Sequence, residues 1–109
     1  MAVNQLEVEV RIASGRAVLD LLGDVDAYTG PRLTEYLNAA VGETEGDVHI
    51  NLARVKFVDS SGIAVFVAAA KQLRERGNDL VVEAPPASVV KVLEMTGVTK
   101  LLKVSPKPS

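Results

Sequence analysis

The stretch Val55-Lys56-Phe57-Val58-Asp59-Ser60-Ser61-Gly62-Ile63 decides the fold, because it lies where a loop gives way to an apolar helix. Before it, apolar and polar residues alternate over 48–52, and this period of two predicts a strand. After it, apolar residues recur at helical spacing until Gly77, so residues 61–76 are predicted to form a long helix. A strand that leads into a helix is the repeating unit of an α/β domain.

The rest of the chain repeats this alternation of strands and helices. Residues 6–12 and 16–22 predict two strands, and the Ser14-Gly15 turn between them predicts an antiparallel hairpin. The further predicted elements are a helix that opens at Thr29-Gly30-Pro31, a strand over 80–84, a helix from Pro85-Pro86 to Thr96, and a strand over 100–104.

This order of elements predicts a single α/β domain over residues 1–104. Its sheet is expected to be mixed and mostly parallel, with about four to five strands, interspersed helices and an N-terminal β-hairpin. Residues 105–109 contain no apolar side chain that could dock on the domain, so they are predicted to form a disordered C-terminal tail.

Composition narrows the possible partners and cofactors. The formal net charge of −2 gives no attraction to nucleic acid or to anionic membranes, so neither is expected as a partner. The chain has no cysteine, which excludes disulfides and thiolate metal sites, and no cofactor is expected. Residues 1–5 have neither a basic start nor a long apolar core, so a cytoplasmic protein without direct membrane insertion is predicted.

Two hydroxyls follow a carboxylate at the predicted start of the long helix. A helix start leaves backbone N–H groups without intrahelical partners and carries partial positive charge, so a phosphate added to Ser60 or Ser61 would be tolerated there. Asp and Ser are also ordinary N-cap residues, so one of these side chains could serve only to cap the helix. The residues alone leave both interpretations open.

Other carboxylates are expected close to these serines. A right-handed crossover would bring the loop over 23–29 and the segment that ends at Ser60 to the same edge of the sheet. Open α/β sheets place their sites at the carboxyl ends of the strands, so Asp24, Asp26 and Asp59 are predicted to form one acidic, partner-docking surface with Ser60. The alternative is that Asp24 and Asp26 are solvated loop residues.

An enzyme that uses a serine nucleophile would need a general base, and His49 is the one histidine in the chain. It alternates with apolar residues inside a predicted strand, so it is expected to pack on a sheet face away from Ser60. The sequence contains neither Gly-x-Ser-x-Gly nor a Gly-x-x-x-x-Gly-Lys phosphate loop. The chain is therefore predicted not to be an enzyme.

Residues 55–63 resemble the signature of anti-sigma factor antagonists of the STAS domain family. The Gly-Asp-Val-Asp-Ala-Tyr-Thr segment at 23–29 and the Met-Thr-Gly-Val-Thr-Lys-Leu segment at 95–101 are also similar to this family, in the same order and spacing. The resemblance spans most of residues 6–104 and implies a STAS-like α/β fold.

The resemblance also implies roles for individual residues. The serine after the aspartate is the phosphorylated one, which is Ser60 here. Asp26 would contact the partner or kinase, and Asp59 would orient the loop or cap the helix. Ser61 would more often be a cap than a second phosphorylation site, and Gly62 would allow close approach of a partner backbone.

The function implied by the resemblance is partner switching. The unphosphorylated form would bind an anti-sigma factor serine kinase and release the sigma factor. The kinase would phosphorylate Ser60 with ATP and end binding, and a serine phosphatase would reset the protein. The alternative is a STAS accessory subunit of a membrane transporter or of a stress-signalling scaffold complex.

Overall fold

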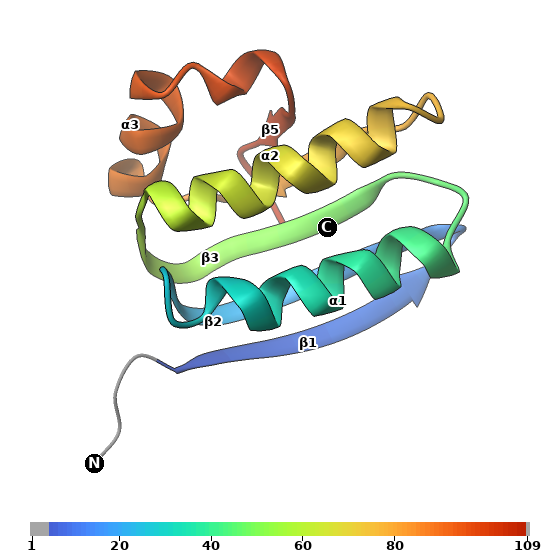
Figure 1. Cartoon of the computed structure of the whole chain (residues 1–109), viewed down its shortest axis with the longest axis horizontal. Coiled ribbons are helices and arrows are strands. Elements are labelled where there is room, and N and C mark those ends of the chain that lie inside the picture. Colours follow the sequence, from blue (N-terminus) through green and yellow to red (C-terminus); the bar gives the residue numbers. More distant parts are fainter. Residues whose placement is uncertain (1–4, 109) are drawn as a thin grey trace.

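The computed structural model describes residues 5–108 and shows a five-stranded sheet in the order β1-β2-β3-β4-β5 (Figure 1). The elements in chain order are β1 (Leu6–Ala13), β2 (Arg16–Val25), α1 (Gly30–Glu43), β3 (Val48–Val58), α2 (Ser60–Arg74), β4 (Leu80–Glu83), α3 (Ala87–Met95), a 3₁₀ helix η1 (Val98–Lys100) and β5 (Lys103–Ser105).

The predicted N-terminal hairpin is confirmed. β1 and β2 pair antiparallel, and Ser14 and Gly15 connect them with φ values of 54° and 77°. Two consecutive residues with positive φ form the type I′ turn, whose twist matches that of a two-stranded ribbon. All other neighbouring strands are parallel, so the predicted mixed, mostly parallel sheet is also confirmed.

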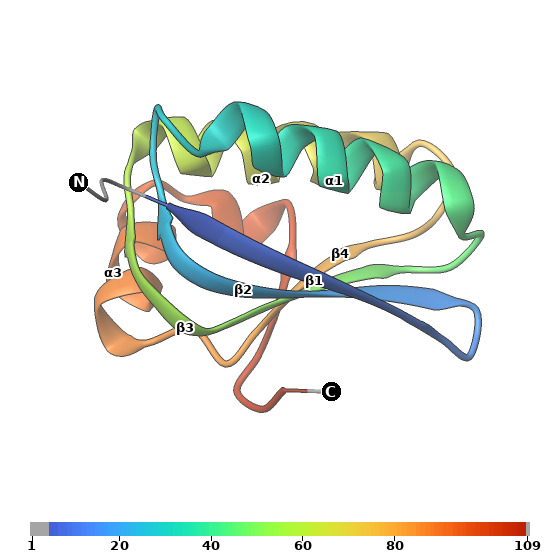
Figure 2. The same cartoon turned by 90° about the horizontal axis from the view of Figure 1, so that it is seen from below.

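Helices α1 and α2 lie side by side over one face of the sheet (Figure 2). Each buries one stripe of small and aliphatic side chains, and Phe66 of α2 is fully buried between helix and sheet. The shorter α3 packs at one end of the sheet, near the end of β3. The core is built mainly from leucine, valine and alanine side chains of the sheet and the helices.

Strand β3 is longer than predicted. The alternation of apolar and polar residues ends at Leu52 and predicts the end of the strand there, yet β3 continues to Val58 beside β2. Two shifts of register occur in this part of the β2–β3 pairing, and they break the alternation. The Asn51 side chain stabilises the backbone at the first register shift, because its Oδ1 accepts a hydrogen bond of 3.0 Å from the Ala53 backbone N–H.

Two further boundary differences concern β2 and the C-terminal strand. β2 runs to Val25, three residues beyond its predicted end. Near the C-terminus, Gly97 ends α3 with φ of 74°, η1 follows, and β5 begins at Lys103. Ser105 lies in β5 and pairs with Glu83, so the prediction that the disordered tail begins at Ser105 is wrong.

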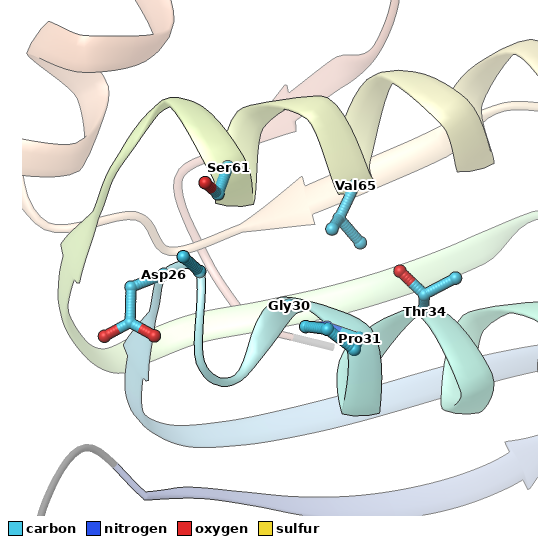
Figure 3. A pocket seen from close by; sticks show the side chains of 7 residues that line it. Asp26, Gly30, Pro31, Thr34, Ser61 and Val65 are labelled. Carbon is cyan, nitrogen blue, oxygen red and sulfur yellow. The ribbon is translucent and has the colours of Figure 1, made fainter.

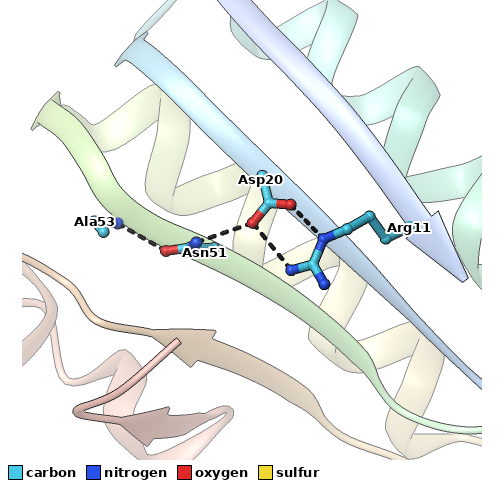
Figure 4. A network of polar contacts seen from close by, with 4 residues as sticks. All are labelled: Arg11, Asp20, Asn51 and Ala53. Carbon is cyan, nitrogen blue, oxygen red and sulfur yellow. Dashed lines mark hydrogen bonds and ion pairs between the residues drawn. The ribbon is translucent and has the colours of Figure 1, made fainter. Parts of the chain in front are cut away.

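The sheet face that α1 and α2 do not cover carries a polar network (Figure 4). Arg11 donates to Asp20 through Nε at 2.7 Å and through Nη2 at 3.3 Å, and Asn51 Nδ2 donates to Asp20 at 2.9 Å. The hydrogen bond from Arg11 is the main reason that the pKa of the Asp20 carboxyl lies below its usual value, with Asn51 and nearby arginine charges adding to it against the effect of burial.

This depressed pKa predicts a pH-dependent contribution of Asp20 to stability. A carboxyl whose folded-state pKa is lowered stabilises the fold above its unfolded pKa of about 3.9, and the contribution is lost as pH falls through the folded pKa. Asp20→Asn is therefore expected to lower the thermal midpoint at pH 7, and the difference from wild type is expected to close in strong acid. Circular dichroism melts from pH 7 to pH 2 test this, and a difference that stays constant with pH would contradict it.

Candidate functional site

The carboxyl ends of β2 and β3 meet at one edge of the sheet, as the crossover predicted. The two strands are parallel, and the Asp59 backbone N–H donates to the Val25 carbonyl at 3.2 Å, which ties their ends together. The β2–α1 loop and the first turn of α2 therefore lie next to each other. The side chains at this edge differ widely in exposure, and the differences separate their roles.

Asp59 caps α2. Its backbone is extended, and its Oδ1 accepts hydrogen bonds from the backbone N–H groups of Ser61 at 2.9 Å and Gly62 at 3.1 Å. These are two of the four N–H groups that a helix start leaves unpaired. The prediction that Asp59 caps the helix is thus confirmed. The prediction that the half-buried Ser61 is a cap is wrong, because the Ser61 backbone N–H is one of the groups that Asp59 caps.

Ser60 is the first residue of α2, and it is exposed. Within residues 5–108, no side chain or backbone group makes a hydrogen bond to its hydroxyl. Because Asp59 already caps the helix, Ser60 is not needed for that purpose. The hydroxyl is therefore accessible at a helix N-terminus, with the Asp59 carboxylate beside it in the chain.

Asp26 holds the β2–α1 loop from inside. It is only 7% exposed, and its Oδ1 accepts from the backbone N–H groups of Tyr28 at 2.9 Å and Thr29 at 3.0 Å. Thr29 Oγ1 in turn accepts from the Asp26 N–H at 3.0 Å and donates to the Asp24 carbonyl at 2.8 Å. Asp26 is thus not a solvated loop residue, and the hydrogen bonds of its carboxylate are to residues of the same loop.

Gly62 allows α2 to start close to the sheet. A Cβ at this position would lie 2.7 Å from Val25 Cγ1, 2.8 Å from the Val25 carbonyl oxygen and 2.9 Å from Val58 Cγ1. Gly62 is also buried. The close approach that it permits is therefore to the domain's own strands β2 and β3.

A shallow groove of about 290 Å³ separates the first turns of α1 and α2 (Figure 3). The polar residues that line it are Asp26, Thr34 and Ser61, and none of its lining residues is basic. No cluster of three or more histidine, cysteine, aspartate or glutamate residues that could hold a metal occurs among the described residues.

Two exposed aromatic side chains that were not predicted to belong to the site lie at the same edge. Tyr28 in the β2–α1 loop is 83% exposed, and Phe57, which pairs with Asp24 in the β2–β3 register, is 49% exposed. The sequence signal for Phe57 is the spacing of the apolar residues Val55 and Val58. Both are buried although they are three positions apart, which strict alternation along a strand does not allow. The strand must therefore contain a bulge between them, and in this bulge Phe57 is exposed.

His49 lies near the start of β3, at the opposite end of that strand from Ser60. Its Nδ1 is 2.7 Å from Glu83 Oε2 of the neighbouring β4, and only 2% of the Glu83 side chain is exposed. His49 is thus too far along the strand to act as a base for Ser60, as the alternation predicted.

In the part of the chain that the structure describes, no helix is long and apolar enough to cross a membrane.

A family model, curated relatives and solved structures were each found to be similar to this chain. A family model described as "Mlab, STAS domain" matches residues 8–103. The anti-sigma-B factor antagonist of Staphylococcus epidermidis is 34% identical over 83 residues, which are 76% of this chain and 77% of the relative.

Solved structures of similar proteins share the fold. The crystal structure of an anti-sigma factor antagonist from Mycobacterium paratuberculosis has a TM-score of 0.81 and 25% identity, and the match covers 97% of this chain and 90% of that one. The antagonist SpoIIAA matches in its unphosphorylated form with a TM-score of 0.77 and 18% identity over 90% of this chain and 87% of its own. The phosphorylated form of this Bacillus protein matches with a TM-score of 0.68 and 19% identity over 92% and 90%.

The family model spans nearly the whole chain, and the staphylococcal relative exceeds 30% identity over about three quarters of both proteins. The fold of the described residues agrees with these matches. The chain therefore belongs to the STAS domain family and groups with its anti-sigma factor antagonists, which are regulatory binding proteins and not enzymes.

Proposed function

We propose that this protein is a cytoplasmic partner switch whose state is set by phosphorylation of Ser60. The unphosphorylated form binds an anti-sigma factor serine kinase, and the sigma factor held by that kinase is released. The kinase transfers the γ-phosphoryl group of ATP to the Ser60 hydroxyl, and the phosphorylated protein dissociates. A serine phosphatase hydrolyses the phosphoserine and restores the binding form.

The exposed hydroxyl of Ser60 is the observation that carries this proposal. A kinase must reach a serine oxygen that is neither buried nor already used in a hydrogen bond, and Ser60 meets both conditions within the described residues. The neighbouring Ser61 does not, because it is half-buried against the groove between α1 and α2. Existence of the related SpoIIAA in phosphorylated and unphosphorylated forms supports the same interpretation.

Charge explains how the phosphate would end binding. A phosphoserine carries about −1.5 to −2 charges at neutral pH, so it would about double the formal net charge of −2 at a single point. That charge would appear beside Asp59 and near Asp24, on a surface that had presented a neutral hydroxyl. The start of α2 tolerates an anion, so the expected effect is local repulsion at the interface without unfolding.

The binding surface in this proposal consists of the exposed edge around Ser60. Asp24, Asp59, Ser60 and Ser61 supply its polar groups, while Asp26 and Gly62 fix the loop and the helix start from beneath. Tyr28 and Phe57 would add apolar anchors, since aromatic side chains often carry much of the energy at protein interfaces. A partner that fits this edge presents basic groups around an apolar patch.

The proposal predicts different behaviour of two Ser60 variants. Ser60→Ala is expected to bind the anti-sigma factor kinase as wild type does but to accept no phosphate, whereas Ser60→Asp is expected to bind at least about tenfold more weakly, a change of about 1.4 kcal/mol. Binding is measured by titration with purified kinase, and phosphate transfer by mass spectrometry after incubation with ATP. Equal thermal midpoints of the two variants would show that the fold is unchanged.

The source of the partner distinguishes this proposal from its alternative. Wild-type and Ser60→Asp proteins are used as baits in the native lysate, and a soluble ATP-binding anti-sigma kinase recovered only by wild type supports the switch. Transporter subunits recovered equally by both baits would support the accessory-subunit alternative and contradict a regulatory role of Ser60.

A further inference from the structure

Strand β1 forms a free edge of the sheet, and this edge is eight residues long. An unpaired edge strand presents a row of backbone N–H and C=O groups that can pair with another strand. The opposite edge, β5, is only three residues long. The β1 edge is therefore the larger of the two surfaces through which this sheet could be extended.

The hairpin geometry settles which backbone groups of β1 face outward. In a two-residue hairpin loop, the residues that flank the turn, here Ala13 and Arg16, exchange backbone hydrogen bonds, and pairs along the ladder then alternate. The N–H and C=O groups of Val8, Val10 and Ile12 consequently point to the free edge. The Leu6 carbonyl fits this pattern, because it accepts a hydrogen bond of 2.6 Å from Arg32 of α1.

The side chains of this edge are apolar on the helix-covered side of the sheet. Leu6 is buried beneath α1, but the cover ends along the strand, so that Val10 is 41% and Ile12 54% exposed. A groove of about 390 Å³ on the surface of α1 is lined by Arg32, Glu35, Tyr36 and Ala39. The exposed side chains of Val10 and Ile12 thus leave apolar surface uncovered along β1.

The charges on the other side of β1 make the strand complementary to itself. In an antiparallel pairing of two copies centred on Val10, Glu9 of each copy lies opposite Arg11 of the other, Val8 lies opposite Ile12, and Val10 lies opposite Val10. Moving the centre by one position to Glu9 or Arg11 would place like charges directly opposite each other, which is destabilising. One register therefore satisfies both faces of the strand.

An existing repulsion within the chain strengthens this preference. Glu9 lies directly opposite Asp20 in the β1–β2 register, and Arg11 forms its ion pair with Asp20 at 2.7 Å. The guanidinium group has five N–H donors, so Arg11 can keep Asp20 and still donate to a second carboxylate. Arg11 from a second copy would give Glu9 the cationic neighbour that its own strand directs to Asp20.

We propose that two copies of this protein associate through β1, in an antiparallel pairing with its twofold axis at Val10. The two sheets then form one continuous sheet, and the outward backbone groups of Val8, Val10 and Ile12 are paired. Ser60 begins α2 above β3, two strands away from this edge, so both surfaces are available in the same molecule. The dimer is independent of the proposed phosphorylation switch.

Sedimentation velocity of the full chain from about 1 to about 500 µM tests the dimer, since a contact limited to one edge strand is expected to be weak. Wild type is expected to shift from monomer to dimer in this range. Val10→Pro is expected to remain monomeric, because its N–H points to the free edge and proline is tolerated on that side of an edge strand. A wild type that stays monomeric throughout, or a dimer that Val10→Pro leaves intact, would overturn the proposal.

Two surface charge variants test the register without depending on proline. Glu9→Lys places like charges opposite each other twice and is expected to raise the dimer Kd about tenfold or more. Glu7→Lys is the matched control, because Glu7 lies opposite Ala13 in this register and its Kd is expected to change less than about threefold. A larger effect of Glu7→Lys than of Glu9→Lys would contradict the pairing centred on Val10.

Discussion

Gly62→Ala is expected to destabilise the protein by about 2 kcal/mol, although alanine is normally the better helix former. Overpacking of a filled site costs about 1–3 kcal/mol, and one of the atoms that the new Cβ would meet is the Val25 backbone carbonyl, which cannot rotate away. The gain in helix propensity, about 0.5–1 kcal/mol, offsets only part of this cost. Urea unfolding followed by circular dichroism measures the difference.

Gly42→Ala is the matched control for this substitution. Gly42 is also helical, but apart from its chain neighbours and the backbone of its own helix, no heavy atom lies within 4 Å of the position that its Cβ would take. Gly42→Ala is therefore expected to stabilise the protein by about 0.5 kcal/mol. If both variants were stabilised, the close packing of α2 on β2 would not be the reason for glycine at position 62.

Gly62→Ala also has a consequence for the proposed switch. The backbone link between Asp59 and Val25 and the cap on Gly62 fix the position of Ser60. A shift of α2 away from Val25 would displace the exposed hydroxyl although the surface chemistry stays unchanged. Partner binding is therefore expected to weaken in Gly62→Ala and to remain unchanged in Gly42→Ala.

The elements whose residues follow a regular period were predictable from the sequence. The alternation over 6–12 and the Ser14-Gly15 turn gave the hairpin, because one strand face is buried and the turn needs positive φ. The continuation of β3 was not predictable in this way. Ala53 and Phe57 lie where register shifts break the alternation, and a bulged strand then has the sequence pattern of a loop.

The roles of residues at the site depended on backbone geometry that a pattern does not contain. Any of Asp59, Ser60 and Ser61 could have capped α2, and the extended backbone of Asp59, with φ −103° and ψ −173°, selected it. Asp24 and Asp26 are two residues apart and chemically identical. The structure places Asp24 half-buried in β2, whereas Asp26 lies in the following loop and is nearly inaccessible.

Asp26→Ala is expected to destabilise the protein by about 2–3 kcal/mol, because two buried or partly buried backbone N–H groups lose a charged acceptor and Thr29 loses a neighbour in the same network. Asp26→Asn keeps an oxygen for the N–H groups of Tyr28 and Thr29, so it is expected to lose less than half as much. Thermal and urea unfolding measure both variants.

Asp24→Ala separates loop structure from partner recognition. Among the described residues, none hydrogen-bonds to the Asp24 carboxylate, since Thr29 donates to its backbone carbonyl. The unfolding free energy of Asp24→Ala is therefore expected to stay within about 0.5 kcal/mol of wild type.

If the edge around Ser60 binds a basic partner surface, Asp24→Ala weakens binding of the anti-sigma factor kinase without loss of stability. Asp26→Asn, which removes a nearly buried charge and keeps the loop, is expected to bind almost as wild type does. If Asp26→Asn bound more weakly than Asp24→Ala, the partner would contact the Asp26 side chain directly, and the loop would have to open to allow that contact.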